Sequence, residues 1–207
     1  MKAGTQMKIN KSPQRAVLTL FLLTLLFFCF VTSIASKNLT AIVIDDKGKT
    51  YKVSDLYAKY TPGGTWIGSR PERVKKSLVI VLNVVEDRVT FTKYFDITFA
   101  SMKLVIFQDA KVPDNLQVFF KDKDKPICIE MRDDSSIFLS NTLFIEIDTQ
   151  GTQRQNIKID RYSFKAGETQ GTNITLDGFG GRAKSASGME GDFWISLSET
   201  KSIEFDN

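Results

Sequence analysis

The stretch FDITFASMKLVIF at Phe95–Phe107 recurs as FWISLSETKSIEF at Phe193–Phe205. A shift of 98 residues aligns the two stretches, and positions 95, 97, 103 and 107 are then identical to their partners. A third copy, IFLSNTLFIEI at Ile137–Ile147, aligns with Ile195–Phe205 at a shift of 58 residues, and Val53–Leu56 is a partial copy. The three full copies consist of a strand-like run, a small or hydroxyl residue, two turn positions and a second run. The repeat therefore predicts a strand-turn-strand corner.

This corner also limits the architectures open to the chain. Where its small residue is serine, the hydroxyl is expected to bond a backbone N–H two or three residues on, which favours one helical turn before the next strand. Successive copies are 40 and 58 residues apart, a spacing too uneven for a propeller or a solenoid. Over about 11 residues the corner is somewhat similar to the turn before the last strand in SH3-like small barrels, a pattern too generic to identify a family.

Short β-branched and aromatic runs separated by turn residues fill the chain on both sides of the repeats. No window of 11 or more residues after position 36 has the apolar spacing of a helix. The sequence therefore predicts an all-β fold of antiparallel hairpins, either a sandwich or two small barrel-like halves, 37–120 and 126–207. The run Leu78–Leu82 is expected to be covered on both faces. The predicted strands are Leu39–Ile44, Thr50–Val53, Leu78–Val85, Val89–Thr92, Ile97–Phe99, Leu104–Phe107, Leu116–Phe120, Ile127–Met131, Ile137–Leu139, Leu143–Ile147, Ile157–Phe164, Ile174–Leu176, Phe193–Leu197 and Ser202–Phe205.

An uncharged run of 21 residues, Ala16–Ser36, follows a basic N-terminus and predicts an apolar export helix. The small residues Ser33 and Ala35 favour a signal peptide cleaved after Ala35 or Ser36, which would make the body secreted or bound at the cell surface. The 19 residues from Ala16 to Ile34 instead favour a single-pass anchor, because about 20 span a bilayer. In both interpretations residues 1–36 are the targeting segment and 37–207 are an exported body.

The charge balance excludes several classes of function. The chain has 28 Lys+Arg, 24 Asp+Glu and no histidine, and residues 1–36 hold four of the basic residues and no acid, so the body is neutral. A neutral body without a basic cluster predicts no nucleic-acid partner. The absence of histidine removes the Ser-His-Asp and Cys-His nucleophiles and histidine-ligated metals. The acidic turns lack the spaced calcium pattern, so we expect neither a metal nor a cofactor.

Two short motifs resemble catalytic or phosphate-binding sequences but are interpreted structurally. Gly178–Ser185 is one residue short of a P-loop because Ala183 replaces a glycine, and no helix-forming segment follows, so no nucleotide is expected. Ser198–Lys201 fits S-x-x-K, but the matching corners at positions 100–103 and 140–143 lack the serine or the lysine. The motif is therefore expected to form a corner and not a catalytic dyad.

The body contains one cysteine, Cys128, so it cannot form an internal disulfide. Alternation in its strand places Ile127 and Ile129 on one face and Cys128 with Glu130 on the other. One interpretation is an exposed thiol that pairs with another chain. The other is a half-covered cysteine that packs as a small hydrophobe.

Two long glycine-rich segments, 61–76 and 177–191, are the predicted recognition loops. Trp66, Arg70, Arg73 and Phe179 are the candidate ligand-binding residues, because aromatic and arginine side chains dominate small recognition sites. The alternative for Trp66 is burial against the sheet. Asn173, in Asn-Ile-Thr, is a candidate glycosylation site.

Taken together, these features predict an exported or membrane-tethered, non-enzymatic all-β interaction or structural module. Its expected partner is an exported protein or a glycan, and its only expected membrane contact is the N-terminal segment. The alternative is an exported β-sandwich enzyme that acts on glycans with paired carboxylates, a hydrolytic chemistry that needs no histidine.

Overall fold

The computed structural model describes residues 39–62, 73–120, 125–169, 172–184 and 188–206. The predicted export helix lies outside these ranges. The strands pair in antiparallel fashion in a single sheet of 13 strands, which confirms the all-β class. The elements are β1 (Thr40–Asp45), β2 (Thr50–Pro62), β3 (Arg73–Lys75), β4 (Ser77–Glu86), β5 (Val89–Thr98), η1 (Phe99–Ser101), β6 (Met102–Ile106), α2 (Asp114–Gln117), β7 (Ile127–Met131), β8 (Ser136–Leu139), β9 (Leu143–Ile147), β10 (Gln153–Thr169), β11 (Thr172–Lys184), β12 (Glu190–Ser196), η2 (Leu197–Glu199) and β13 (Thr200–Phe205).

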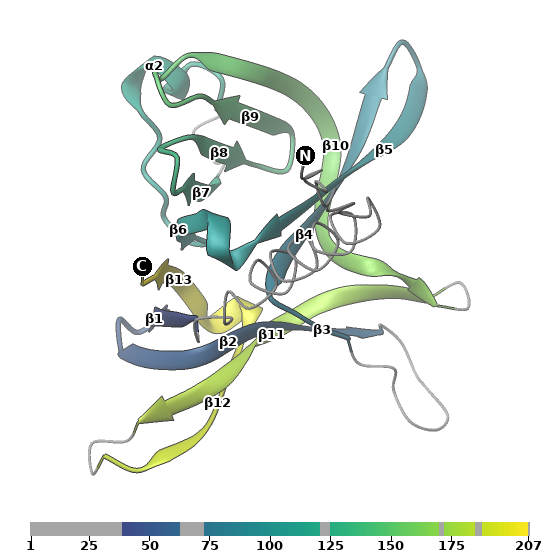
Figure 1. The fold of residues 1–207 in the computed structure, drawn as a ribbon. Helices are drawn as coiled ribbons and strands as arrows, with labels where there is room; N and C mark the ends of the chain where they lie inside the picture. The colour runs from purple at the N-terminus through teal and green to yellow at the C-terminus, as the bar shows by residue number, and fades with distance from the viewer. Residues whose placement is uncertain (1–38, 63–72, 121–124, 170–171, 185–187, 207) are drawn as a thin grey trace, which may run out of the picture. The chain divides into compact units, whose positions relative to one another are not determined.

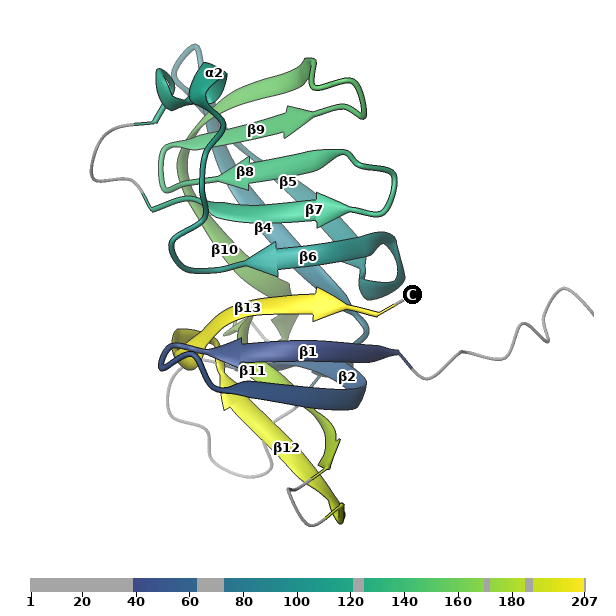
Figure 2. The same ribbon diagram turned by 90° about the vertical axis from the view of Figure 1, so that its left-hand side faces the viewer.

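The sheet joins the two ends of the described chain in its middle. The strand order is β12-β11-β2-β1-β13-β6-β7-β8-β9-β10-β4-β5, and β3 pairs with β2. An additional pairing between β10 and β11 makes the path of neighbours close on itself. Figure 2 shows the neighbours β1, β13, β6, β7 and β8 facing the viewer, with β4, β5 and β10 behind them.

The main hydrophobic core lies between these two sets of strands. The side chains of Leu78–Leu82 in β4 are all buried, as the unbroken apolar run predicts. Phe95 of β5 stacks on Phe144 of β9, with ring centroids 4.9 Å apart, so β5 packs on the strand that follows β8 in the sheet. Figure 1 shows the long strand β10 between β9 and the β4–β5 pair. Burial of the apolar side chains that the two sets of strands turn toward each other stabilises this packing.

Two of the predicted corners form with the same local structure. β5 leads through the single 3-10 turn η1 into β6, and β12 leads through η2 into β13. β6 and β13 then pair with each other, and Val105 lies opposite Ile203, the residue that the 98-residue shift makes equivalent to it. Because equivalent residues pair in antiparallel fashion, a local two-fold axis relates the two corners.

Contacts around the corners repeat as well. The Ser101 carbonyl of η1 accepts the backbone N–H of Arg132, just after β7, at 2.9 Å. The Glu199 carbonyl of η2 accepts the backbone N–H of Asp46, just after β1, at 2.8 Å. β7 and β1 therefore occupy equivalent places beside β6 and β13.

The predicted serine cap is wrong at the η2 corner, where the small residue is Ser198; at the η1 corner that residue is Ala100, for which no cap was expected. Neither η1 nor η2 has a side-chain cap hydrogen bond. The hydroxyls of Ser101 and Thr200 instead donate to the carbonyls of Thr98 and Ser196, both at 2.7 Å. The predicted bond occurs only at the third copy, where the Thr142 N–H donates to Ser140 Oγ at 3.3 Å in a tight hairpin between β8 and β9.

Several predicted boundaries are also corrected. Leu116–Phe120 is not a strand, because the chain makes a helical turn, α2, directly after Pro113. The partial copy Val53–Leu56 lies within the continuous strand β2, where Asp55 adopts a positive φ of 53°. Much of the expected loop 177–191 belongs to the paired strands β11 and β12. Within the described part of the chain, no helix has the length and apolar character needed to cross a membrane.

Candidate functional site

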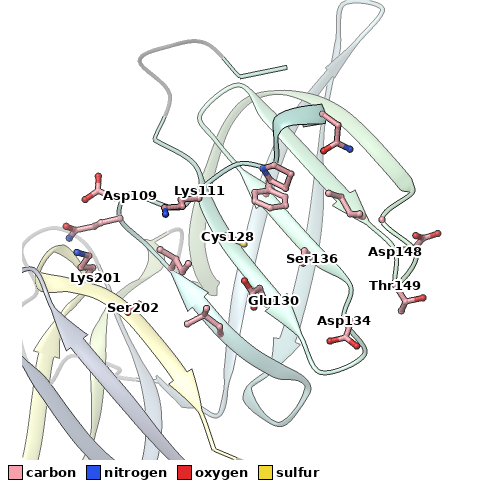
Figure 3. Close-up of a pocket in the computed structure, with 18 residues that line it drawn as sticks. Asp109, Lys111, Cys128, Glu130, Asp134, Ser136, Asp148, Thr149, Lys201 and Ser202 are labelled. Atoms are coloured by element: carbon pink, nitrogen blue, oxygen red, sulfur yellow. The ribbon is translucent and has the colours of Figure 1, made fainter. Parts of the chain in front are cut away.

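An open groove of about 710 Å³ lies on the outer face of β13, β6, β7 and β8. Its volume lies in the range of pockets that bind small molecules or short segments. Figure 3 shows its polar side chains around the rim and the Cys128 sulfur near its centre. The groove lies on the opposite side of these strands from the main core.

Cross-strand pairing produces the floor of the groove. Ser202, Ile106, Cys128 and Phe138 form one row across β13, β6, β7 and β8, because each is the register partner of the next. A second row contains Leu104, Glu130 and Ser136. Partners in register point to the same face of a sheet. Leu104 and Ile106 are half-buried, so the floor offers apolar surface that the chain itself does not fully cover.

The segment between β6 and β7 forms one wall. Leu116, from α2, packs over a small outer core that also contains Cys128, Phe138, Ile145 and Ile147. Both faces of β7 therefore pack against apolar side chains. Ile127 and Ile129 face the main core and Cys128 faces the small outer core, which confirms the predicted alternation.

This wall covers the Cys128 thiol. Cys128 is only 4% exposed, so its side chain is buried. Burial, with a smaller contribution from the charge of Glu130, raises the pKa of Cys128 to about 12. A thiol with such a pKa is protonated and a poor nucleophile near neutral pH.

The groove carries opposite charges at its two ends. Lys111 and Lys201 lie toward one end together with Asp109, while Asp134 and Asp148 lie toward the other, as Figure 3 shows. Asp109 is 3.7 Å from Lys125 Nζ, so the first end keeps an excess of positive charge. Glu130 lies between the ends on the floor, beside the half-buried Leu104. This distribution favours an elongated ligand that has an acidic group at one end, a basic group at the other and apolar surface over Leu104 and Ile106.

Turn geometry accounts for most of the acids around the groove. Asp148 accepts the backbone N–H groups of Gln150 and Thr152 at 3.0 and 2.8 Å. Asp134 occupies a turn with a positive φ of 65°. Asp109 lies 3.7 Å from Lys125 Nζ, with a side chain 66% exposed. These carboxylates shape and charge the rim, and the geometry around them is that of turns and exposed ion pairs.

Of the candidate ligand-binding residues predicted from the sequence, the structure describes Arg73 and Phe179. Trp66 and Arg70 lie outside the described residues. Arg73 is exposed in β3, and its guanidinium donates to the carbonyl of Ala166 at 3.1 Å. Phe179 is in β11 and only 1% exposed, with its ring against Phe99 and Phe107, so it is part of the core. Neither Arg73 nor Phe179 lines the groove.

Asn173 is exposed at the start of β11, where Lys165 Nζ donates to its Oδ1 at 3.0 Å. Its place on the surface is compatible with the glycosylation motif, whose use stays a prediction.

Sequence reasoning missed the groove because its parts are distant in the chain. Its floor joins β6 to β13, almost 100 residues later, and that pairing is not visible in local patterns. The one available signal was the face shared by Cys128 and Glu130, which the alternation had identified.

No protein-family model matches the chain, and neither curated proteins nor solved structures give a significant match.

Proposed function

We propose that the chain is an exported, non-enzymatic all-β binding module, released by cleavage after Ala35 or Ser36 or tethered by its N-terminal segment. Its partner is an exported polypeptide, one segment of which lies in the groove. The observation that carries the proposal is the half-buried floor of Leu104 and Ile106 between a basic and an acidic end. Apolar contact in the middle with opposite charges at the rim is how protein interfaces combine affinity with orientation.

A rigid frame supports this role. The floor strands are held from behind by the main core and from the side by the small core around Leu116. A preorganised surface binds with a smaller loss of conformational entropy than a mobile one. The groove can therefore select a segment without first ordering its own backbone.

The proposal extends to the architecture. The strand order β12-β11-β2-β1-β13, with a 3-10 turn between β12 and β13, supports a small barrel-like half that combines residues from both ends of the body. The other half consists of β4 to β10, and the two halves meet where β6 pairs with β13 around the local two-fold axis. This division takes the place of the predicted halves 37–120 and 126–207, because β4 to β10 run across that boundary.

The alternative, a glycan-active enzyme, has less support. Such an enzyme holds two carboxyl groups on either side of the sugar bond. The carboxylates on the rim of the groove instead belong to turns or exposed ion pairs: Asp148 accepts the backbone N–H groups of Gln150 and Thr152, and Asp109 lies 3.7 Å from Lys125 Nζ.

Site-specific photo-crosslinking in intact cells tests the proposal. A photoreactive residue at Ser136, on the floor, should cross-link to a discrete polypeptide, whereas the same residue at Thr92, exposed on β5, should not. Lys201→Glu should weaken the cross-link by reversing a charge at the basic end. Equal cross-linking from both positions, or none from Ser136, would contradict a polypeptide-binding groove.

Export is tested on the recovered protein. An N-terminus at Ser36 or Lys37 supports the released form, and full-length mass in the membrane fraction supports the tethered form. Full-length protein in the cytosol contradicts export.

A further inference from the structure

A second surface, on the outer face of β2, β11 and β12, has a composition unlike that of the groove. Tyr57 of β2 and Trp194 of β12 are both register partners of Gly180 in β11, so the two aromatic side chains and the glycine share one face. A side chain at position 180 would collide with the Tyr57 ring. The absence of a side chain at Gly180 therefore leaves room for the end of the Tyr57 ring over β11.

A second glycine of β11 lies on the same surface. Gly178 is the register partner of Lys59 on one side and of Ser196 on the other, so β11 contributes no side chain there either. Lys59 Nζ lies 5.3 Å from the centroid of the Trp194 ring. Trp194 remains 46% exposed, which is high for a residue whose burial is ordinarily favourable.

An open pocket of about 600 Å³ borders the Tyr57 ring. Its charged side chains are Asp55, Lys75, Lys76, Arg182 and Asp192. Lys75 Nζ is paired outside the lining with Asp96 at 3.0 Å, and Lys76 Nζ lies 3.8 Å from Asp55. Arg182 is the register partner of Asp192, so each positive charge has an acidic neighbour. Charged donors and acceptors that neutralise one another favour a neutral ligand with many hydroxyl groups over an anion or a cation.

We infer that this surface binds a neutral glycan, with a pyranose ring stacked on Tyr57 and a neighbouring sugar unit on Trp194. The C–H face of a pyranose is apolar and packs on an aromatic ring, while its hydroxyls hydrogen-bond to carboxylates and guanidinium groups at the edge. The site uses different strands from the groove and stands independently of the polypeptide partner proposed for it.

Aromatic cover of a strand glycine also has a purely structural use, since a large neighbour restores packing that the glycine lacks. That role requires the Tyr57 ring but not an exposed tryptophan on the other side of Gly180. The two explanations therefore differ in what the loss of Trp194 does.

Affinity electrophoresis of the full-length chain, in a non-glycosidic detergent, tests the inference. Gels would contain β-1,3-glucan, xylan, mannan or, as the anionic comparison, polygalacturonate. We expect retardation by at least one of the three neutral polysaccharides. The dissociation constant should rise about tenfold or more in Trp194→Ala and Tyr57→Ala, and change by less than about twofold in Tyr57→Phe, which keeps the ring.

Melting temperatures of the variants separate binding from folding. Trp194→Ala removes an exposed side chain and should leave the melting temperature close to that of the parent, so its loss of retardation would support the glycan site even if Tyr57→Ala fails to fold. The inference is overturned if no neutral polysaccharide retards the chain, if only polygalacturonate does, or if Trp194→Ala migrates like the parent.

Discussion

Asp45 shows how one carboxylate organises a turn. It ends β1, and its Oδ1 accepts the backbone N–H groups of Lys47 and Lys49 at 3.0 and 2.7 Å, while Tyr51 donates its hydroxyl to Oδ2 at 3.2 Å. Burial alone would raise the pKa of Asp45, but these hydrogen bonds to the charged form outweigh it and the pKa is lowered. The group therefore stabilises the fold above its unfolded pKa and stops doing so as the pH falls through its folded pKa.

We expect Asp45→Asn to lower the melting temperature at neutral pH and to reduce the acid sensitivity of the fold. An asparagine cannot provide the charged acceptor, and it does not titrate. Melting curves from pH 7 down to about 2 would measure the pH dependence of stability. Asp177→Asn is the control, because Asp177 is an exposed residue of β11. A steeper loss of stability in acid for Asp45→Asn than for the parent would contradict the assignment.

Cys128 leads to a prediction about accessibility. Because the thiol is buried and its pKa is raised to about 12, iodoacetamide at pH 8 should leave it unmodified in the native chain and modify it in urea. Peptide mapping distinguishes it from Cys29. Leu116→Ala should speed its modification by loosening the packing of α2 over it. Rapid modification of the native parent would show that the wall opens readily.

The two 3-10 corners are held by hydrogen bonds from side-chain hydroxyls to backbone carbonyls and not by side-chain caps. Thr200 is fully buried, and its hydroxyl donates to the Ser196 carbonyl across η2. Ser198 is exposed, and its hydroxyl lies 3.1 Å from that of Ser196. Gln108 adds a bond from its Nε2 to the Ser198 carbonyl at 3.1 Å, which ties the end of β6 to the second corner.

The two residues should therefore respond differently to loss of the hydroxyl. Thr200→Val keeps the shape but removes a partner of the Ser196 carbonyl, and should cost about 0.5–1.5 kcal/mol of unfolding free energy. Ser198→Ala should change stability by less than about 0.5 kcal/mol, as surface substitutions usually do. Denaturant unfolding compares them. A larger loss in Ser198→Ala would restore the capping role that its position in the repeat predicted.

For the whole molecule, the position of β13 matters most. The last strand of the chain lies in the middle of the sheet, between β1 and β6, and it buries Ile203 and Phe205. Loss of a central strand leaves the backbone groups of both neighbours without partners and opens the core.

A chain that ends after Glu199 should therefore lose cooperative unfolding, whereas a chain that ends after Asp206 should fold like the parent. Asp206 is kept in the control because its N–H donates to the Thr40 carbonyl and its carbonyl accepts from Arg132 Nη2. Thermal unfolding followed by circular dichroism would compare the two. A sharp transition in the shorter chain would mean that β4 to β10 hold the fold without β13.

The sequence by itself determined the all-β class, the places of most strands and the two 3-10 corners, since these follow from local alternation and from a repeat of 13 residues. It also determined which face of β7 each residue occupies, because side chains alternate strictly along a strand. Its errors fell where local patterns compete, as at Leu116, whose apolar neighbours favour a strand while Pro113 starts a helical turn.

Only the tertiary structure decided which strands become neighbours. The pairing of β13 with β1 and β6 brings together residues that are about 100 or more positions apart, and both the groove and the local two-fold axis depend on it. Likewise, the glycines at 178 and 180 became a flat surface and not a loop only because β2 and β12 flank them. Pairing of this kind is set by the burial of whole faces against each other, a property of the assembled sheet that no single segment carries.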